Sequence, residues 1–434
     1  MYLSHRLAIL ALVVSLPAAL LPFPVWETLL IVNGTLAAFA VLDVVRAPRA
    51  ASLILEREVP QVSGLDRTDG VSVRIHNPLE RPLEISLRDA GPPSLRRDPI
   101  RHLAVVPGGS WHMLEAVVAP SRRGFADIGP VTLRTSGPLR LAGRQGKVPT
   151  RARIKIYPPL PGRAHVARRI ERARELQTGS RSSAFRGGGN EFDSLRTYHP
   201  DDEYRRINWF ATARAGTPIT NVYREERDQQ IILLMDAGRG MAGSVAGTSR
   251  FELAIDAGFA LAELATYVGD RVGMVAFGGS VQRMIGPRGR RDQPRRILDL
   301  LFDLEPVLEA SDYRGAFAAT LGRYRRRAML VLLTELTDIR AMDPLFAALP
   351  SLLSRHIVVV AAVQDPGVTE LAGAEPTDSE GAYLKAAATE SLTSRDRARA
   401  RLRAMGVGVE DRLPGELAAG VADRYLAIKS AGRL

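Results

Sequence analysis

Cysteine is absent from this chain of 434 residues. Its absence excludes disulfide bonds, zinc sites built on thiolates and cysteine nucleophiles. Histidine is scarce as well, with 7 residues that are scattered and form no paired helical motif for a hydrolytic metal. The stretch "GRGMAGSVAG" lacks the lysine of a phosphate-binding loop, and neither Ser244 nor Ser249 lies in a nucleophile elbow. We therefore predict that the protein is not an enzyme, and a hydrolase is kept as an alternative.

Positive charge is in excess, with a formal net charge of +12 and an isoelectric point near 10.4. Such a balance favours acidic surfaces such as anionic lipid, nucleic acid or an acidic protein. The basic residues are nonetheless spread along the chain and mixed with acids, as in "RDRARARLRAMG". That mixture is typical of solvated helix faces. A nucleic-acid- or anionic-surface-binding protein is therefore an alternative function that rests on charge alone.

Two long apolar runs open the chain. Residues 7–25 are apolar, and residues 25–45 are apolar apart from three polar or acidic positions. Each run is near the roughly 20 residues needed to cross a bilayer. The break "PFPVWE" indicates a tight turn, so residues 1–46 are predicted to form a transmembrane helical hairpin, with a cleaved signal peptide as the alternative. Arginines flank both ends, which predicts a location in the cell (inner) membrane with the soluble domains facing the cytoplasm.

The next two regions differ in pattern. Residues 50–157 alternate apolar and polar positions in short runs separated by turn formers, which predicts a small all-β sandwich. Residues 158–230 begin with a charged helical piece and a flexible glycine- and serine-rich stretch, and end in a dense mixture of arginine, acid and aromatic residues. Stacking on nucleic acid is one interpretation of that mixture. We favour internal arginine–carboxylate pairs that pin an irregular segment against a neighbouring domain, because the acids nearly cancel the arginines.

From residue 231 to residue 434 apolar strands and amphipathic helices alternate. Runs such as "IILLMD" and "AMLVLL" are typical of strands buried on both faces, so this region is predicted to be a doubly wound α/β domain with a mostly parallel sheet. Such sheets bind ligands at the carboxyl ends of their strands. Asp236, Ser311 and Glu335 fall at or near those ends. Their oxygens are the ligands that Mg²⁺ or another divalent cation prefers, so they are the candidate metal site.

The order of these elements, with the acid-ended first strand, "GDRVGMVAFGG" and "LLTELTD", resembles a von Willebrand factor A domain. The preceding "YHPDDEYRRINWFATARAGTPITNVYREE" is similar to the signature of the DUF58 family, and the similarity extends back to residues 121–141. The signature falls on seven positions here, which are Tyr198, Pro200, Asp202, Arg205, Ile207, Trp209 and Arg214.

The resemblance carries further expectations. The metal-ion-dependent adhesion site of von Willebrand A domains falls on Asp236, Gly238, Gly240, Ser311 and Glu335, so glycines stand where two serines are usual and a glutamate where an aspartate is usual. This is a degenerate site. The layout also resembles that of partners of MoxR-type AAA+ ATPases. It implies a bacterial, membrane-anchored, non-enzymatic scaffold that works with such an ATPase in the assembly or maturation of membrane or envelope complexes.

Overall fold

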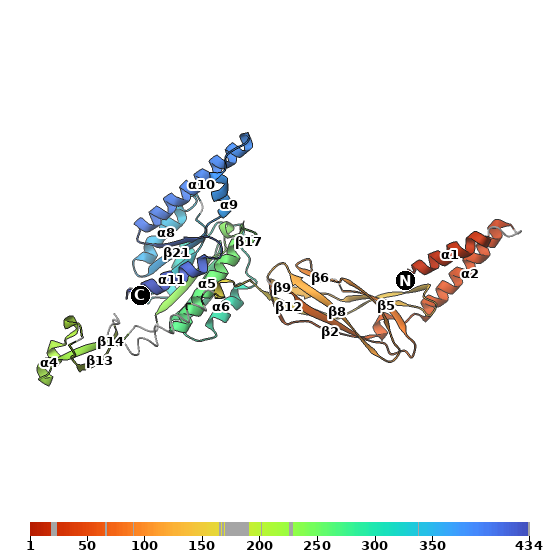
Figure 1. Cartoon of the computed structure of the whole chain (residues 1–434), viewed down its shortest axis with the longest axis horizontal. Helices are drawn as coiled ribbons and strands as arrows, with labels where there is room; N and C mark the ends of the chain where they lie inside the picture. The colour runs from red at the N-terminus through yellow and green to blue at the C-terminus, as the bar shows by residue number, and fades with distance from the viewer. Residues whose placement is uncertain are drawn as a thin grey trace. The chain divides into compact units, whose positions relative to one another are not determined.

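The computed structural model describes residues 1–18, 24–65, 67–89, 91–164, 166, 169, 191–200, 202–224, 229–336 and 338–432. The chain divides into two compact units, Met1–Pro158 and Pro159–Leu434, which are described separately (Figure 1). The expected charged helix over residues 164–179 and the flexible stretch 179–190 lie almost wholly outside the described residues.

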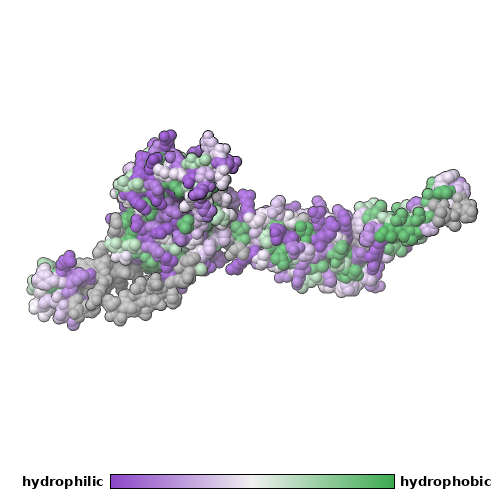
Figure 2. Space-filling view, turned by 45° about the horizontal axis from the view of Figure 1, so that its top comes forward, coloured by the Kyte–Doolittle hydropathy of each residue, from purple (hydrophilic) through white to green (hydrophobic). Residues whose placement is uncertain are grey.

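The first unit begins with two apolar helices, α1 (His5–Ala18) and α2 (Val25–Arg46). At about 1.5 Å per residue, the 22 residues of α2 extend for about 33 Å, which matches an apolar bilayer core of about 30 Å. The described residues contain one helix that is long and apolar enough to cross a membrane, and it begins at Val25. Hydrophobic residues gather over this pair of helices (Figure 2). The second span of the expected hairpin is not shown, because α1 has 14 residues.

The carboxyl end of α2 is fixed to the β-strands of the same unit. Asp43 is buried near the end of this helix, and its carboxylate accepts hydrogen bonds from the backbone N–H groups of Leu139, Leu141 and Ala142 at 2.7 to 2.9 Å. Gly137 leaves room for that carboxylate, since a Cβ there would overlap it. The helix therefore ends in a specific junction with the sheet that follows.

Among the described residues of the first unit eleven more strands follow, and together with β1 they form three sheets. Their bounds are β2 (Ile54–Glu58), β3 (Val62–Gly64), β4 (Asp69–His76), β5 (Leu83–Arg88), β6 (Leu95–Asp98), β7 (Arg101–Val106), β8 (Trp111–Pro120), β9 (Gly124–Ile128), β10 (Val131–Ser136), β11 (Ala142–Val148) and β12 (Ala152–Tyr157). The sheet orders are β1-β11-β10-β5-β7, where β1 is Tyr2–Leu3, then β2-β4-β8-β6, and β3-β12-β9.

The four-stranded sheet contributes to two hydrophobic cores of this unit. One core joins it to the five-stranded sheet, through residues such as Ile75, Ile85 and Leu133. The other joins it to the three-stranded sheet, through residues such as Val118 and Ile154. Alternate residues point inward in β5 and β10, so the alternation seen in the sequence is that of strands with one buried face.

The second unit contains a small hairpin, here called the signature hairpin (residues 191–224). Its strands β13 (Glu191–Thr197) and β14 (Ile219–Arg224) are antiparallel. Between them lie the 3-10 turn Tyr204–Arg206 and the short helix α4 (Trp209–Ala215). Asn208 caps α4 by accepting a hydrogen bond from the N–H of Ala211, and Gly216 ends it with a φ of 70°.

A six-stranded sheet forms the centre of the second unit, in the order β19-β18-β15-β20-β21-β22. The strands are β15 (Gln230–Asp236), β18 (Arg271–Phe277), β19 (Val281–Arg288), β20 (Met329–Leu333), β21 (Ile357–Val363) and β22 (Gly408–Arg412). All neighbours are parallel except β18 and β19. The alternation of strands and helices predicted after residue 231 is thus confirmed.

Helices cover both faces of this sheet (Figure 1). Their bounds are α5 (Arg250–Val268), α6 (Gln293–Leu301), α7 (Tyr313–Arg323), α8 (Asp343–Leu353), α9 (Pro366–Gly373), α10 (Ser379–Ala404) and α11 (Leu417–Ser430). Helices α7, α8 and α10 pack on the core that includes Leu234, Leu332 and Val360. Helix α5 packs against α6 and α11. Figure 1 shows α10 continuing past the sheet beside α9.

The strand order determines where a site can form. Counted along the unit, the order is 3-2-1-4-5-6, so the chain turns to opposite sides of β15 after its first and third strands. The carboxyl ends of β15 and β20 meet at this switch point, which is where doubly wound sheets bind ligands. Asp236 is the last residue of β15, and Thr334 directly follows β20.

Candidate functional site

Asp236 is the polar centre of the carboxyl edge of the sheet. Its strand is apolar up to Met235 because both faces are covered by helices, and the carboxylate itself is only 2% exposed. A charge at this depth requires hydrogen-bond donors, since an unpaired carboxylate in an apolar interior is strongly unfavourable. The structure provides those donors from three different loops.

Four donors surround the Asp236 carboxylate. Oδ1 accepts hydrogen bonds from the N–H of Gly238 at 2.8 Å and from the Ser311 hydroxyl at 2.6 Å. Oδ2 accepts from the Tyr313 phenol at 2.9 Å and from the Thr334 hydroxyl at 2.5 Å. Each carboxylate oxygen thus accepts two bonds, all from this chain. The carboxylate is held in one orientation by β15, by the start of α7 and by the end of β20.

Burial raises the pKa of Tyr313, and the negative charge of Asp236 raises it further. The phenol therefore stays protonated at any physiological pH and serves as a hydrogen-bond donor. Its ring packs edge-on against Phe277, with ring centroids 5.7 Å apart. Tyr313 thus combines an apolar body within the core with a hydroxyl that reaches Asp236.

The two glycines after Asp236 have different surroundings. A Cβ on Gly238 would overlap the Ser311 hydroxyl, so the glycine is required for Ser311 to reach Asp236. A Cβ on Gly240 would lie 3.5 Å from the Cβ of Glu335, which is ordinary contact. A serine would therefore fit at position 240 but not at position 238. The Ser311 hydroxyl fills the space into which a serine at position 238 would extend.

A divalent cation at Asp236 would need lone pairs of the carboxylate, and these already accept hydrogen bonds from Ser311, Tyr313 and Thr334. A cation would therefore have to displace some of these bonds. Among the described residues no group of three or more histidine, cysteine, aspartate or glutamate side chains could hold a metal ion. Asp236 and Ser311 lie side by side, as expected for the candidate site. They are joined by a direct hydrogen bond between the hydroxyl and the carboxylate.

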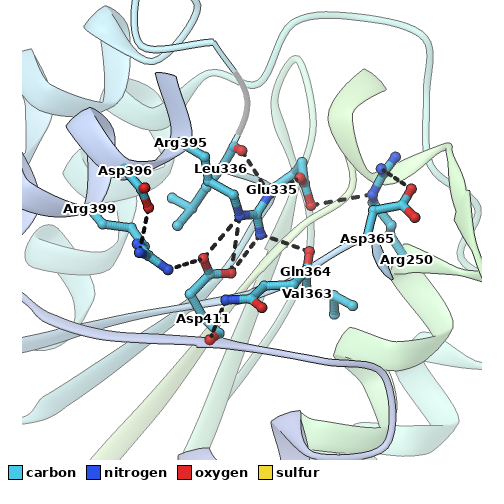
Figure 3. A network of polar contacts seen from close by, with 10 residues as sticks. All are labelled: Arg250, Glu335, Leu336, Val363, Gln364, Asp365, Arg395, Asp396, Arg399 and Asp411. Carbon is cyan, nitrogen blue, oxygen red and sulfur yellow. Dashed lines mark hydrogen bonds and ion pairs between the residues drawn. The ribbon is translucent and has the colours of Figure 1, made fainter. Parts of the chain in front are cut away.

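Glu335, the third candidate ligand, belongs to a separate network of ion pairs (Figure 3). Its Oε1 accepts a hydrogen bond from Arg395 at 2.7 Å, and its Oε2 lies 3.3 Å from Nε of Arg250. Arg395 also pairs with Asp411 at 2.6 Å and donates to the backbone carbonyl groups of Leu336 and Val363. Through Glu335, Arg395 and Asp411 this network therefore links α5 and α10 to the ends of β20, β21 and β22.

The protonation of this network follows from burial and charge. Burial raises the pKa of Glu335, although Arg395 and Arg250 oppose the shift. Burial alone would lower the pKa of Arg395, but Asp411 and Glu335 together raise it above its usual range. Arg395 is thus a permanent cation that ties α10 to the carboxyl edge of β20 and β21.

A loop between α6 and α7, here called the covering loop (residues 305–312), closes over the edge. The N–H of Val307 donates to the carbonyl of Ala237 at 2.8 Å, and the carbonyl of Glu309 accepts from Arg239 at 2.9 Å. Between these contacts Leu308 is 83% exposed. The surface above Asp236 is therefore a fixed loop with an apolar side chain at its outer side.

The seven signature positions all lie in the signature hairpin. Asp202 accepts hydrogen bonds from Arg196 at 2.6 Å and from the N–H of His199 at 2.9 Å. The Tyr198 hydroxyl donates to the backbone carbonyl of Asp202 at 3.4 Å, and Ile207 is buried. Pro200, Arg205, Trp209 and Arg214 lie at the exposed surface of the hairpin. The expected arginine–carboxylate pairing thus occurs within this segment, at Asp202.

Aromatic side chains gather on the outside of the same hairpin. Tyr204, Trp209 and Phe210 are 67%, 58% and 69% exposed. The rings of Tyr204 and Trp209 meet edge to face, with centroids 5.6 Å apart, and the Arg214 guanidinium lies 4.3 Å from the Phe210 centroid. Exposed aromatic and arginine side chains of this kind are enriched at protein interfaces.

Tyr313 and Thr334 are not among the three candidate ligands predicted from the sequence, although each makes one of the four bonds to Asp236. Side chains alternate in direction along an extended chain, so of two neighbours at a strand end only one can face Asp236. Thr334 faces it and Glu335 faces Arg395. The one sequence feature that could have indicated Tyr313 as a partner of Asp236 is its position two residues after Ser311.

Part of this chain is similar in sequence to a family and to proteins that have no assigned function. The family described as "Protein of unknown function DUF58" matches residues 194–406, which include the signature hairpin except its first three residues, and most of the α/β region. Uncharacterized proteins of Mycobacterium tuberculosis and Mycobacterium bovis are each 29% identical over 188 residues, which is 43% of this chain and 58% of theirs. The chain thus spans little more than half the length of these relatives.

Among solved structures, alpha-2-macroglobulin from E. coli and from Salmonella are similar to a part of the chain. Both are 16% identical with a TM-score of 0.20, and they cover 24% and 25% of this chain and 7% of their own. A likeness at that level carries no argument about fold or function.

Proposed function

We propose that this protein is a membrane-anchored, non-enzymatic scaffold whose α/β region is of the von Willebrand factor A type. In this proposal it binds a protein partner at the carboxyl edge of the sheet. The observation that carries the proposal is the closure of Asp236 by four donors of its own chain. In this proposal the carboxylate serves neither as a base nor as a metal ligand, because its oxygens are occupied by these bonds. It keeps the loops of the edge in a fixed arrangement, as a preformed binding surface requires.

The topology supports the von Willebrand A assignment. The order 3-2-1-4-5-6 with one antiparallel edge strand, and an aspartate that ends the central strand, agree with the resemblance found in the sequence. This chain differs from a von Willebrand A domain at the position of the metal site, where the hydroxyls of Ser311, Tyr313 and Thr334 surround Asp236. Partner binding in this proposal is therefore independent of a divalent cation.

The covering loop supports the position of the binding surface. Leu308 is exposed directly above a rigid edge, and an exposed apolar side chain on a rigid support binds with little loss of conformational freedom. The partner proposed from the resemblance is a MoxR-type AAA+ ATPase, working on membrane or envelope complexes. The apolar helix α2 and the Asp43 junction support a membrane anchor, and the arginines around the helices favour a cytoplasmic position for the rest.

The test is a pull-down from detergent-solubilised membranes with the full chain as bait, followed by identification of the captured proteins by mass spectrometry. Wild-type protein is expected to capture an AAA+ ATPase equally well in Mg²⁺ and in EDTA. Leu308→Asp is expected to reduce capture at least about tenfold, since a charge in a desolvated apolar contact is strongly unfavourable.

Leu384→Asp is the matched control, because Leu384 is an exposed leucine of α10 outside the covering loop. It should leave capture unchanged. Loss of capture in EDTA would show that the edge works through a metal ion. Equal loss of capture in both leucine variants would show that the covering loop is not part of the binding surface. Recovery of nucleic acid in place of protein would favour the alternative function that rests on charge.

A further inference from the structure

A second site lies at the open edge of the α/β sheet, on the far side of β21 from Asp236. The cavity there has a volume of about 440 Å³, which is within the range of small-molecule sites. It lies where α10, β22 and α11 meet. Seven residues line it, namely Arg399, Arg403, Val409, Glu410, Asp411, Arg412 and Arg424.

Strand β22 is the outermost strand of the sheet, and β21 is its one partner among the described strands. An exposed edge of this kind presents backbone polar groups to whatever lies beside it. The side chains around this edge are almost all charged, so an apolar ligand would leave them without partners. The cavity therefore suits a polar, charged ligand.

Two arginine nitrogens at the cavity lack a hydrogen-bond acceptor. Nε of Arg399 and Nε of Arg424 are buried, and neither has an acceptor among the described residues. The Arg424 guanidinium has only a long contact with Glu410, at 3.8 Å. Arg403 is exposed and forms no ion pair within the described part of the chain. Buried donors of this kind normally have a partner, and a bound acceptor would provide it.

The acids at the cavity do not balance these arginines. The Asp411 carboxylate accepts bonds from Arg395 and Arg399, and Glu410 accepts from Arg412 at 3.1 Å. Four arginines thus face two carboxylates in the lining. The neighbours behind them, Arg395 and Asp396, add one charge of each sign and leave the excess unchanged. The cavity is therefore positively charged by about two units.

Two glycines let the arginines approach the strand and the helix closely. A Cβ on Gly408 of β22 would lie 2.9 Å from Nη2 of Arg424, and a Cβ on Gly420 of α11 would lie 3.1 Å from Nε of Arg412. Either side chain would displace a guanidinium. The arrangement of the arginines thus depends on the backbone around them as well as on their own charge.

We propose that this cavity binds an oxyanion of the phosphate class, either free or as the phosphate group of a small molecule. Guanidinium groups match phosphate oxygens with paired, charge-assisted hydrogen bonds. Arg403 and Arg424 supply donors that no carboxylate of the lining satisfies, while Glu410 holds Arg412 in place. The site is separate from Asp236, although Asp411 of its lining also bonds Arg395 in the network of Glu335.

The experiment is isothermal titration calorimetry on the full chain in detergent, with inorganic phosphate and glycerol 3-phosphate as probes at constant ionic strength. Saturable binding of at least one probe is expected, and the tighter probe tells whether the free anion or the monoester fits better. The double variant R403Q/R424Q is expected to weaken binding at least about tenfold, because it removes two charged donors.

Arg397→Gln is the control for loss of a surface charge, since Arg397 is an exposed arginine of α10 outside the cavity; it removes one charge where the double variant removes two. It should change the affinity less than about twofold at constant ionic strength. Absence of saturable binding by both probes would overturn the proposal. An equal effect of Arg397→Gln and of the double variant would also overturn it, because general charge would then explain the binding. Binding of a glutamate-rich peptide but of neither phosphate would replace the phosphate with a carboxylate ligand.

Discussion

At the carboxyl edge of the sheet the Asp236 carboxylate is buried and hydrogen-bonded, whereas in the signature hairpin large aromatic side chains are exposed at the surface. Asp236 is 2% exposed and accepts four hydrogen bonds, while Trp209 is 58% exposed and contacts another exposed ring. The family match includes both regions. Internal hydrogen bonds thus hold the polar centre of the edge in place, whereas the hairpin leaves large rings at its surface.

Asp236→Ala is expected to have the largest effect on stability. It leaves the Ser311 hydroxyl and one backbone N–H without their acceptor. The hydroxyls of Tyr313 and Thr334 lie 3.0 Å apart, so one of them can donate to the other and one is left unpaired. Three donors thus lose their partner at about 1 to 3 kcal/mol each, and the free energy of unfolding should fall by about 3 kcal/mol or more. Urea unfolding of the full chain in detergent, with hydrogen exchange of β15 as the local measurement, would show it.

Asp312→Ala provides the control for Asp236→Ala, because Asp312 caps α7 at the surface and should cost only about 1 kcal/mol. Addition of Mg²⁺ or EDTA to the wild type should not shift the unfolding midpoint, since a ligand stabilises only the state that binds it. A clear Mg²⁺-dependent stabilisation that disappears in Asp236→Ala would contradict the closed arrangement.

Arg395→Met tests the second buried network of the same edge. The variant leaves Glu335 and Asp411 buried without their main cation, and breaking a buried pair in this way costs about 3 kcal/mol. Arg397→Met removes an exposed arginine from the same helix and should change the free energy of unfolding by less than about 0.5 kcal/mol. Similar unfolding curves for the two variants would show that the network does not stabilise the edge.

Asp256 shows what burial does to the pKa of an aspartate that has few hydrogen-bond donors around it. This aspartate of α5 is buried like Asp236, but within the described part of the chain its hydrogen-bond donor is one N–H group, that of Gly162, at 3.0 and 3.1 Å. Burial raises its pKa to about 6, and the Gly162 bond opposes the shift. Because the pKa is higher in the folded than in the unfolded state, ionisation destabilises the fold. The cost begins near pH 4 and is complete above about pH 6.

Asp256→Asn should remove this dependence. Relative to the wild type, the variant is expected to gain about 2 to 3 kcal/mol of unfolding free energy between about pH 4 and pH 7. The comparison uses the difference between the two proteins at each pH, so that all other titrating groups cancel. A difference that stays constant across this range would mean that Asp256 has an ordinary pKa in the folded protein.

Trp209→Ser should have the smallest effect, because its ring is mostly exposed on the signature hairpin. The free energy of unfolding is expected to change by less than about 0.5 kcal/mol. Ile207→Ser, at the buried position of the same hairpin, should instead raise hydrogen exchange of β13 and β14. A large loss of stability in Trp209→Ser would show that this ring packs against another part of the protein.

Much of the fold follows from local patterns. Continuous apolar strands such as β15 and β20 identify a sheet buried on both faces, and period-two alternation identifies the strands of the first unit. Asp236 could be located as a site residue because it ends such a strand. Glu335 could not be placed, because the direction of a side chain at a strand end depends on a residue far away in sequence, here Arg395.

The sequence by itself determined the apolar N-terminal helix, the succession of strands and helices, and the presence of an aspartate at the end of the central strand. These depend on periodicity and composition within a few residues. The tertiary structure alone decided that Asp236 is surrounded by Ser311, Tyr313 and Thr334 and that Glu335 turns to Arg395. The physical reason is that a buried charge takes whichever donors the folded chain brings to it, and those donors come from segments 75 to 98 residues away.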